Sequence, residues 1–365
     1  MGFVLCDDFF DVRDRGQSTR QRTLRKFPGV LARFWQLAPA VRSLICRRQS
    51  SFFPVIVFSI VLPVFLVIAF GSLLTRTRFL SAALITELNR LTYFVGLPAY
   101  LFANVAEASF GGGRAATIFA VMAGATLLTL GFGWAVARIR RVPAESFGSF
   151  LHAAIRGNLA YIGLPVVSLA LAAHAGPAAD RLGQVALVAM APLVVITNTL
   201  GVLLLLIGHE RPGTVMWRSI CWQLATNPLM LAIVAGVLCA GAGWRLPGWI
   251  MQSVQIVGQM ALPLALLCIG GTLVAMPLRG KRTTALIASV LKIAVVPLFG
   301  WPLGRAAGLS PDEMRITLLF LACPTAAASF TLAGKLGGDE ALAASSVVIS
   351  TLLSVLSISA VLALV

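Results

Sequence analysis

Two stretches of the chain decide its fold: NLAYIGLPVVSLAL at residues 158–171 and LLFLACPTAAASFTLA at residues 318–333. Each places a proline in the middle of a long apolar segment. Proline has no N–H group and its ring clashes with the carbonyl four residues earlier, so a helix breaks or kinks there. In a membrane, the backbone groups that a break frees must find partners within the protein or line a cavity. We therefore expect a binding site where helices break at Pro165 and Pro324.

Two further prolines, Pro98 and Pro263, follow leucine in similar apolar surroundings, and we expect helix breaks there as well. For any single proline, an ordinary packing kink is the alternative, because proline is common in transmembrane helices.

The composition is that of a polytopic membrane protein. Of the 365 residues, 58% are hydrophobic and only 12% are charged, whereas soluble domains carry about 25% charged residues. The net charge of +16 comes from basic residues in the first 50 positions and at the ends of apolar segments. Nucleic acid is therefore not needed to explain it. The six cysteines form no CxxC pair and have no histidine at metal spacing, so we expect no disulfide, no metal and no cofactor.

Ten apolar segments have the length of about 20 residues that a membrane span needs. They lie at residues 52–75, 82–108, 115–137, 145–174, 180–208, 219–243, 248–277, 283–307, 314–336 and 340–365. A basic tail precedes them at residues 1–51, which we expect to be disordered or amphipathic.

The segments repeat with a constant offset. The pairs Pro63 and Pro228, Gly71 and Gly236, and Pro98 and Pro263 are each 165 residues apart. This spacing predicts two five-helix repeats, at 52–208 and 219–365, joined by a short connector at 209–218. Because five is odd, the second repeat enters the membrane from the opposite side, as in many secondary transporters.

The short loops predict the orientation of the chain. Eleven basic residues lie on one side, namely Arg76, Arg78, Arg138, Arg140, Arg141, Arg211, Arg218, Arg279, Lys281, Arg282 and Lys335, and five lie on the other, namely Arg114, Arg181, Arg245, Arg305 and Arg315. We expect the first side to be cytoplasmic. The basic tail opposes this orientation, and whether it belongs to the working protein stays open.

Several stretches resemble the auxin efflux carrier family, which includes bacterial organic-acid permeases such as malonate carriers. The stretches are LNRLTYFVGLPAYLF, NLAYIGLP, TNPLMLAIVAGVL, MALPLALLCIGGTL and CPTAAASFTLAGKLGGDEALAASSVVISTLLS, and the resemblance covers about residues 54–365. It implies that helices four and nine cross at their prolines, with a small organic anion bound beside the crossing. Some members carry asparagine where this chain has Ala328, and Ser329 or Thr325 is then expected to take that polar role.

The expected crossing favours anions, because a half-helix that begins after a break presents free N–H groups and a positive dipole end. By position, the N–H groups of Val166, Val167, Thr325 and Ala326 are the candidates. The expected substrate-binding residues are Asn158, Gly163, Pro165, Val166, Pro324, Thr325, Ser329 and Lys292.

Three polar residues within the segments leave alternatives open. Asn158 lies two helical turns before Pro165 and contacts either the substrate or a neighbouring helix. Lys292 lies deep in its segment, where it pairs with an anion or with backbone carbonyls, or extends to the interface. Arg156 is expected to reach the interface, and a proton relay through His152 is not favoured.

The function that fits best is a secondary transporter of small organic anions in the cytoplasmic (inner) membrane. A sodium-coupled symporter of the bile-acid type, a channel and a non-transporting sensor are the alternatives. Either H+ or Na+ is compatible as coupling ion, and the chain is compatible with a homodimer. No hydrolase or phosphate-binding motif is present, so we do not expect an enzyme.

Overall fold

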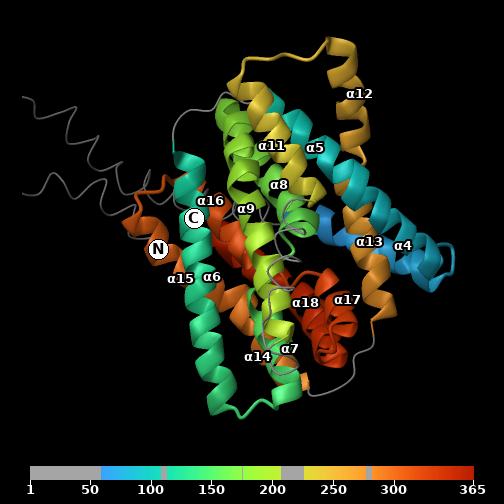
Figure 1. Cartoon of the computed structure of the whole chain (residues 1–365), viewed down its shortest axis with the longest axis vertical. Helices are drawn as coiled ribbons and strands as arrows, with labels where there is room; N and C mark the ends of the chain where they lie inside the picture. The colour runs from blue at the N-terminus through green and yellow to red at the C-terminus, as the bar shows by residue number, and fades with distance from the viewer. Residues whose placement is uncertain (1–58, 108–112, 175, 207–225, 277–281) are drawn as a thin grey trace, which may run out of the picture. The chain divides into compact units, whose positions relative to one another are not determined.

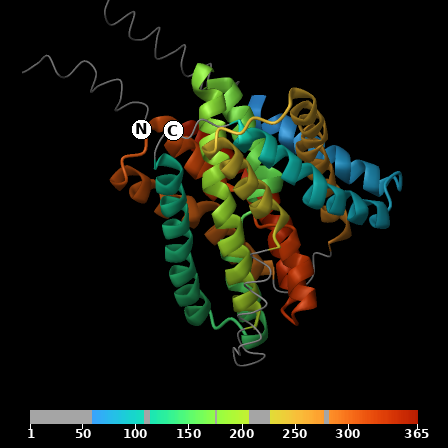
Figure 2. The same cartoon turned by 45° about the horizontal axis from the view of Figure 1, so that its top comes forward.

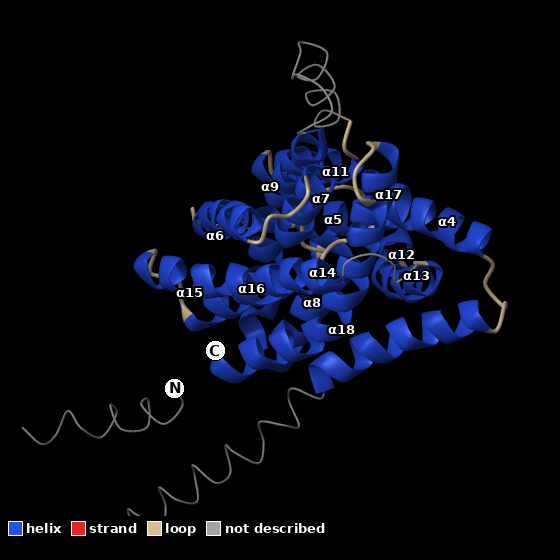
Figure 3. Cartoon of the chain, turned by 90° about the horizontal axis from the view of Figure 1, so that it is seen from below, coloured by secondary structure: helices blue, strands red, loops and turns tan. Residues whose placement is uncertain are grey.

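The computed structural model describes residues 59–107, 113–174, 176–206, 226–276 and 282–365. Within these ranges every regular element is a helix (Figure 3). The predicted tail at 1–51 and the predicted connector at 209–218 lie outside the described residues, as do Arg279 and Lys281.

Six described helical stretches are long enough and apolar enough to cross a membrane. They are Ser59–Arg76, α6 (Arg114–Ile139), α9 (Ala179–Leu206), α12 with α13 (Gly248–Gln259 and Ala261–Ala275), α14 to α15 (Arg282–Val290, η5 at Leu291–Val295 and Val296–Ala306) and α18 (Glu340–Leu364).

The other helices are shorter pieces. They are α4, η2 and α5 (Ala82–Leu91, Thr92–Gly96 and Leu97–Ala106), α7, η3 and α8 (Ala144–Ile155, Leu159–Gly163 and Leu164–His174), the short η4 (Gly176–Ala178), α11 (Pro228–Gly241), α16 (Pro311–Ala322) and α17 (Ala328–Lys335). The described helices follow the predicted segments in order, but several extend one to three residues beyond the predicted bounds, and η4 lies between two of the segments. The ten spans and the inverted relation of the two repeats stay predictions.

Glycines allow two pairs of helices to approach closely, and the two pairs are related by the predicted repeat. In the Ser59–Arg76 helix, Gly71 packs against α13, where the Ser72 hydroxyl donates to the carbonyl of Gly270 at 2.9 Å. In α11, a Cβ added at Gly236 would lie 2.9 Å from the Cβ of Val105 in α5. Figures 1 and 2 show α5 and α11 side by side. The first contact joins the first predicted segment to the seventh, and the second joins the sixth to the second. Exchanging the two predicted repeats converts one contact into the other.

The breaks expected at Pro98 and Pro263 are absent. A five-residue π-turn, η2, precedes Pro98, and the N–H of Leu97 donates to Thr92, five residues back. The wider turn takes the carbonyls out of the α-helical register just before the residue that lacks an N–H, so the helix continues. At Pro263 only Met260 separates α12 from α13, and the chain remains one 28-residue helical stretch.

A π-turn also precedes two more prolines. The π-turn η3 ends at Gly163, two residues before Pro165, and η5 ends at Val295, two residues before Pro297. Pro165 therefore lies within continuous helix, so the break expected there is wrong in position.

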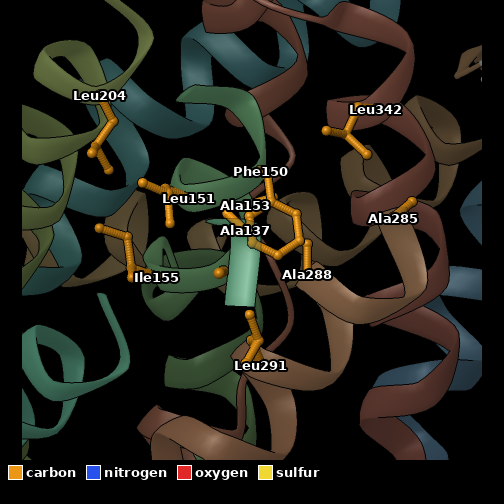
Figure 4. Packing of buried hydrophobic residues seen from close by; sticks show 11 residues of the cluster. Ala137, Phe150, Leu151, Ala153, Ile155, Leu204, Ala285, Ala288, Leu291 and Leu342 are labelled. Atoms are coloured by element: carbon orange, nitrogen blue, oxygen red, sulfur yellow. The ribbon is translucent and has the colours of Figure 1, made fainter. Parts of the chain in front are cut away.

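The second half of α7 packs into a buried cluster with α14 (Figure 4). Phe150 and Leu151 of α7 are buried there with Ala285, Ala288 and Leu291 of α14 and η5. Ala285 and Ala288 let the two helices approach closely, and this packing fixes α7 just before the break that follows Ile155.

Candidate functional site

The fourth predicted segment, residues 145–174, is called helix four here and contains α7, η3 and α8. It breaks immediately after α7. Its last helical residue is Ile155, the backbone is extended at Arg156 (φ −84°, ψ 99°), and helix resumes with η3 at Leu159. The break is thus Arg156-Gly157-Asn158, and Asn158 lies seven residues before the proline that was expected to cause it. Glycine and asparagine are both poor helix formers, so this dipeptide is the local cause.

The ninth predicted segment, residues 314–336, is called helix nine and corresponds to α16 and α17. It breaks at Pro324, where the break was predicted. The last residue of α16 is Ala322, Cys323 is extended (φ −60°, ψ 145°), and α17 begins at Ala328. Pro324 lies inside this break. The residue before a proline is disfavoured in helical geometry, which explains why α16 ends at Ala322 and Cys323 is extended.

The two breaks meet as a pair of short antiparallel segments. The N–H of Asn158 donates to the carbonyl of Pro324 at 2.8 Å, and the N–H of Ala326 donates to the carbonyl of Arg156 at 3.0 Å. Gly157 and Thr325 face each other between these bonds. The extended residues of each helix thus satisfy the backbone of the other, as a dehydrated environment requires. We call this region, Arg156–Asn158 with Cys323–Ala327, the crossing.

The carboxyl end of α16 is fully capped by its surroundings. The Lys292 ammonium group donates to the carbonyl of Leu321 at 2.7 Å, and the hydroxyl of Ser357 donates to that of Ala322 at 3.1 Å. Cys323 bonds the remaining two carbonyls, donating from its thiol to Leu319 and from its N–H to Phe320. All four carbonyls that a helix end leaves unpaired therefore have donors.

Lys292 serves this helix end and does not extend to the membrane interface. Its side chain is 2% exposed. It lies so close to Gly157 that a Cβ added there would be 3.0 Å from the Lys292 Cε. The sequence leaves open whether Lys292 pairs with an anion, pairs with a backbone carbonyl at a break or extends to the interface. The structure shows the second of these. Its positive charge also lies at the negative end of the α16 dipole.

Thr325 has its hydrogen-bonding groups occupied by the protein itself. Its N–H donates to the hydroxyl oxygen of Ser350 at 3.0 Å, and its own hydroxyl donates to the carbonyl of Ala153 at 2.8 Å. The N–H of Ala326 is likewise used, by Arg156. The expectation that these two N–H groups are free for an anion is therefore wrong.

The expectation for Val166 and Val167 is also wrong, because helix resumes at Leu159 and both residues lie well inside it. The N–H groups without a partner in the preceding turn are instead those of Leu159, Ala160 and Tyr161. The carbonyl of Asn158 already accepts from Ile162 and Gly163.

Gly163 contributes close packing. A Cβ at this position would lie 2.9 Å from the Phe320 ring and 3.2 Å from the Cys323 thiol. Only glycine lets η3 approach α16 this closely, so Gly163 holds the two broken helices together.

Two side chains at the crossing remain available for a ligand. Asn158 is 7% exposed, and no described residue hydrogen-bonds its side-chain amide. The hydroxyl of Ser329, at the start of α17, is buried and has no partner among the described residues.

Arg156 is the charged group of the crossing, which the sequence did not lead us to expect. Its guanidinium lies 3.4 Å from Nε2 of His152, one turn back in α7, instead of reaching the interface. No carboxylate among the described residues forms an ion pair with it. His152 is itself fully buried, and its Nδ1 has no partner among those residues.

The three tyrosines of the chain form contacts between helices two, four and six. Tyr93 lies within electrostatic range of Arg156 and accepts a hydrogen bond from Asn227 at 3.4 Å. Tyr161 donates to the carbonyl of Asn89 at 3.3 Å, and the hydroxyl of Tyr100 lies 3.4 Å from that of Ser168. The spacing of the tyrosines in the sequence does not predict these contacts, because the contacts depend on how helices two, four and six pack.

The chain also matches known proteins. A family model described as "Membrane transport protein" matches residues 56–362, which include both breaks. A relative from Rhizobium meliloti (strain 1021), described as "Putative malonate transporter", is 25% identical over 318 residues, which cover 84% of this chain and 95% of the relative. The expected resemblance to auxin efflux carrier-like proteins is confirmed. The chain is a multi-pass membrane protein that belongs to the membrane transport protein family.

Proposed function

We propose that this protein carries small organic carboxylates across the cytoplasmic membrane by alternating access around the crossing. The observation that carries the proposal is the Arg156 guanidinium, which lies in the break of helix four with no carboxylate partner among the described residues. An ionisable group inside a membrane segment is costly and is retained for function. A bound anion would supply the missing partner.

Recognition of a carboxylate fits the donors around Arg156. A guanidinium pairs with a carboxylate through two parallel N–H···O bonds. The free N–H groups of Leu159, Ala160 and Tyr161 begin only three residues later, at the positive end of the second half-helix. Asn158 would orient the substrate, and the unpartnered Ser329 hydroxyl would hold its far end.

Malonate is the first substrate to test, because the relative's name refers to it. A short dicarboxylate has a second anionic group for the donors of α17 once Arg156 holds the first. Lys292 would add positive potential without direct contact, since its ammonium group already serves the carbonyl of Leu321.

For transport, the two predicted repeats would rock against each other while the crossing stays intact, held by its two backbone hydrogen bonds. The candidate coupling ions are H+ and Na+, and uptake under an imposed pH gradient or sodium gradient distinguishes them.

The experiment reconstitutes the full chain in proteoliposomes and measures uptake of radiolabelled malonate. In parallel, a thermal-shift screen compares mono- and dicarboxylates with neutral isosteres such as malonamide. We expect a carboxylate to raise the apparent melting temperature by mass action and its amide to leave it unchanged. Preference for a cation would contradict the proposal. Binding without flux would favour a sensor over a transporter.

A further inference from the structure

A second feature lies away from the crossing, at the carboxyl end of α6. There α6, α7 and α9 pack against one another and enclose a groove with a volume of about 830 Å³. Its apolar walls come from Leu130 and Gly131 of α6, Leu151 of α7 and Leu204 of α9, and Arg138 and Arg141 lie among its lining residues. Leu151 and Leu204 lie on the same side of the buried cluster in Figure 4.

Arg138 is held in a fixed position by two aromatic rings. Its guanidinium carbon lies 5.1 Å from the centroid of the Trp134 ring and 5.5 Å from that of Phe147. Rings on the faces of a guanidinium leave the N–H groups at its edge free to donate. No carboxylate among the described residues pairs with Arg138, so an anion can bind at that edge.

Arg141 follows directly after the helix. Its positive φ of 51° turns the chain sharply at this point, and its side chain is exposed and lines the same groove. Two cations that form no ion pair with any described residue therefore flank the groove where α6 ends.

The depth of these groups matches the layers of a bilayer. With 26 residues, α6 is about 39 Å long, whereas the hydrocarbon layer is about 30 Å thick. Arg138, the last residue but one, would lie at headgroup level, and Trp134, which is half exposed, would lie at the interface where tryptophan is enriched. Gly131 and Leu130 lie two turns deeper. The groove is thus lined by arginines at its mouth and by apolar residues at its floor.

We propose that this groove binds an anionic phospholipid, with the phosphate on Arg138 and Arg141 and an acyl chain along Leu130, Gly131 and Leu204. The polybasic mouth distinguishes an anionic lipid from a zwitterionic one, as in other basic pockets between transmembrane helices. The site is separate from the crossing, so it does not depend on the substrate.

The test titrates delipidated full-length protein with detergent micelles that contain phosphatidylglycerol or phosphatidylcholine and follows the melting temperature. We expect phosphatidylglycerol to stabilise the protein more. Arg138→Gln should weaken its apparent affinity about fivefold, the usual effect of one basic residue near a membrane surface. Arg76→Gln is the matched control, because Arg76 is also exposed near a helix end but lies outside the groove, and it should change little.

Gly131→Leu tests the acyl-chain half of the site independently of charge. A Cβ at Gly131 would meet no atom within 4 Å, so the start of a side chain has space there, and leucine should occupy part of the groove and reduce binding of phosphatidylglycerol. Glycerophosphoglycerol, which carries the headgroup without chains, should not stabilise the protein.

Three results would each overturn the proposal. They are equal stabilisation by the two lipids, equal losses for Arg138→Gln and Arg76→Gln, and full protection by the chain-free headgroup.

Discussion

The two broken helices of the crossing differ in how their polar groups are used. In helix nine, the carbonyls that end α16 and the N–H and hydroxyl groups of Thr325 have partners within the protein, and only the Ser329 hydroxyl lacks one among the described residues of the break and the start of α17. In helix four, the Arg156 guanidinium lacks a carboxylate and the Asn158 amide lacks a hydrogen bond among the described residues. We infer that helix nine mainly supports the crossing, whereas helix four supplies the charged group that binds the ligand and helix nine adds only the Ser329 hydroxyl.

The largest effect is expected for Arg156→Gln. Removing the charged partner of a buried carboxylate typically costs about 2 kcal/mol or more, so substrate affinity should fall at least about thirtyfold. Stability without substrate should not fall, because an unpaired cation beside His152 is removed. Thermal unfolding across a malonate titration measures both quantities. Unchanged affinity would remove Arg156 from the site.

Thr325→Val should show the opposite pattern. Valine leaves the carbonyl of Ala153 without its donor, which should lower the free energy of unfolding by about 1–3 kcal/mol. Thr325→Ser, the matched control, keeps the hydroxyl and should recover most of that loss. Thermal unfolding of the two variants decides the matter, and equal stability would show that the hydroxyl bond contributes nothing.

Lys292→Gln tests whether this residue supports helix nine or contacts substrate. Loss of the ammonium group uncaps the carbonyl of Leu321, while relief of its desolvation offsets part of the cost, so we expect about 1 kcal/mol of destabilisation. Substrate affinity should change far less than in Arg156→Gln. An affinity loss as large as that of Arg156→Gln would place Lys292 in direct contact with the anion.

The smallest effect is expected for Asn158→Ala. A neutral hydrogen bond contributes about 0.5–1.5 kcal/mol, so affinity should fall about two- to tenfold. The backbone bond from Asn158 to Pro324 survives the change, and stability should be nearly unchanged. Uptake kinetics in proteoliposomes would reveal the loss, and wild-type kinetics would restrict Asn158 to a backbone role.

Much of the architecture could be predicted from hydropathy, because apolar segments of spanning length and repeated glycines are visible in the sequence. The break at Pro324 was predicted in place, since proline acts there directly. The break of helix four was predicted seven residues too late. The π-turn η3 before Pro165 lets the helix continue although proline has no N–H to donate. Hydropathy does not reveal such a turn.

The candidate site was less accessible to prediction than the fold. Thr325 is a candidate from its position at a break and Lys292 from its depth in an apolar segment, but whether such a group is free depends on neighbours such as Ser350 and Leu321, far away in the sequence. Arg156 was assigned to the interface because helical geometry was extended through it. The Gly157-Asn158 dipeptide that follows it was the available sign that the helix ends there.

The account depends most directly on which of two cations near the crossing, Arg156 or Lys292, binds the anion. The decisive measurement is malonate binding, by titration of thermal stability, to Arg156→Gln and Lys292→Gln side by side. We predict that Arg156→Gln keeps its stability and loses the malonate-induced shift, whereas Lys292→Gln is less stable and keeps the shift. The reverse pattern, with binding lost in Lys292→Gln and retained in Arg156→Gln, would contradict the account.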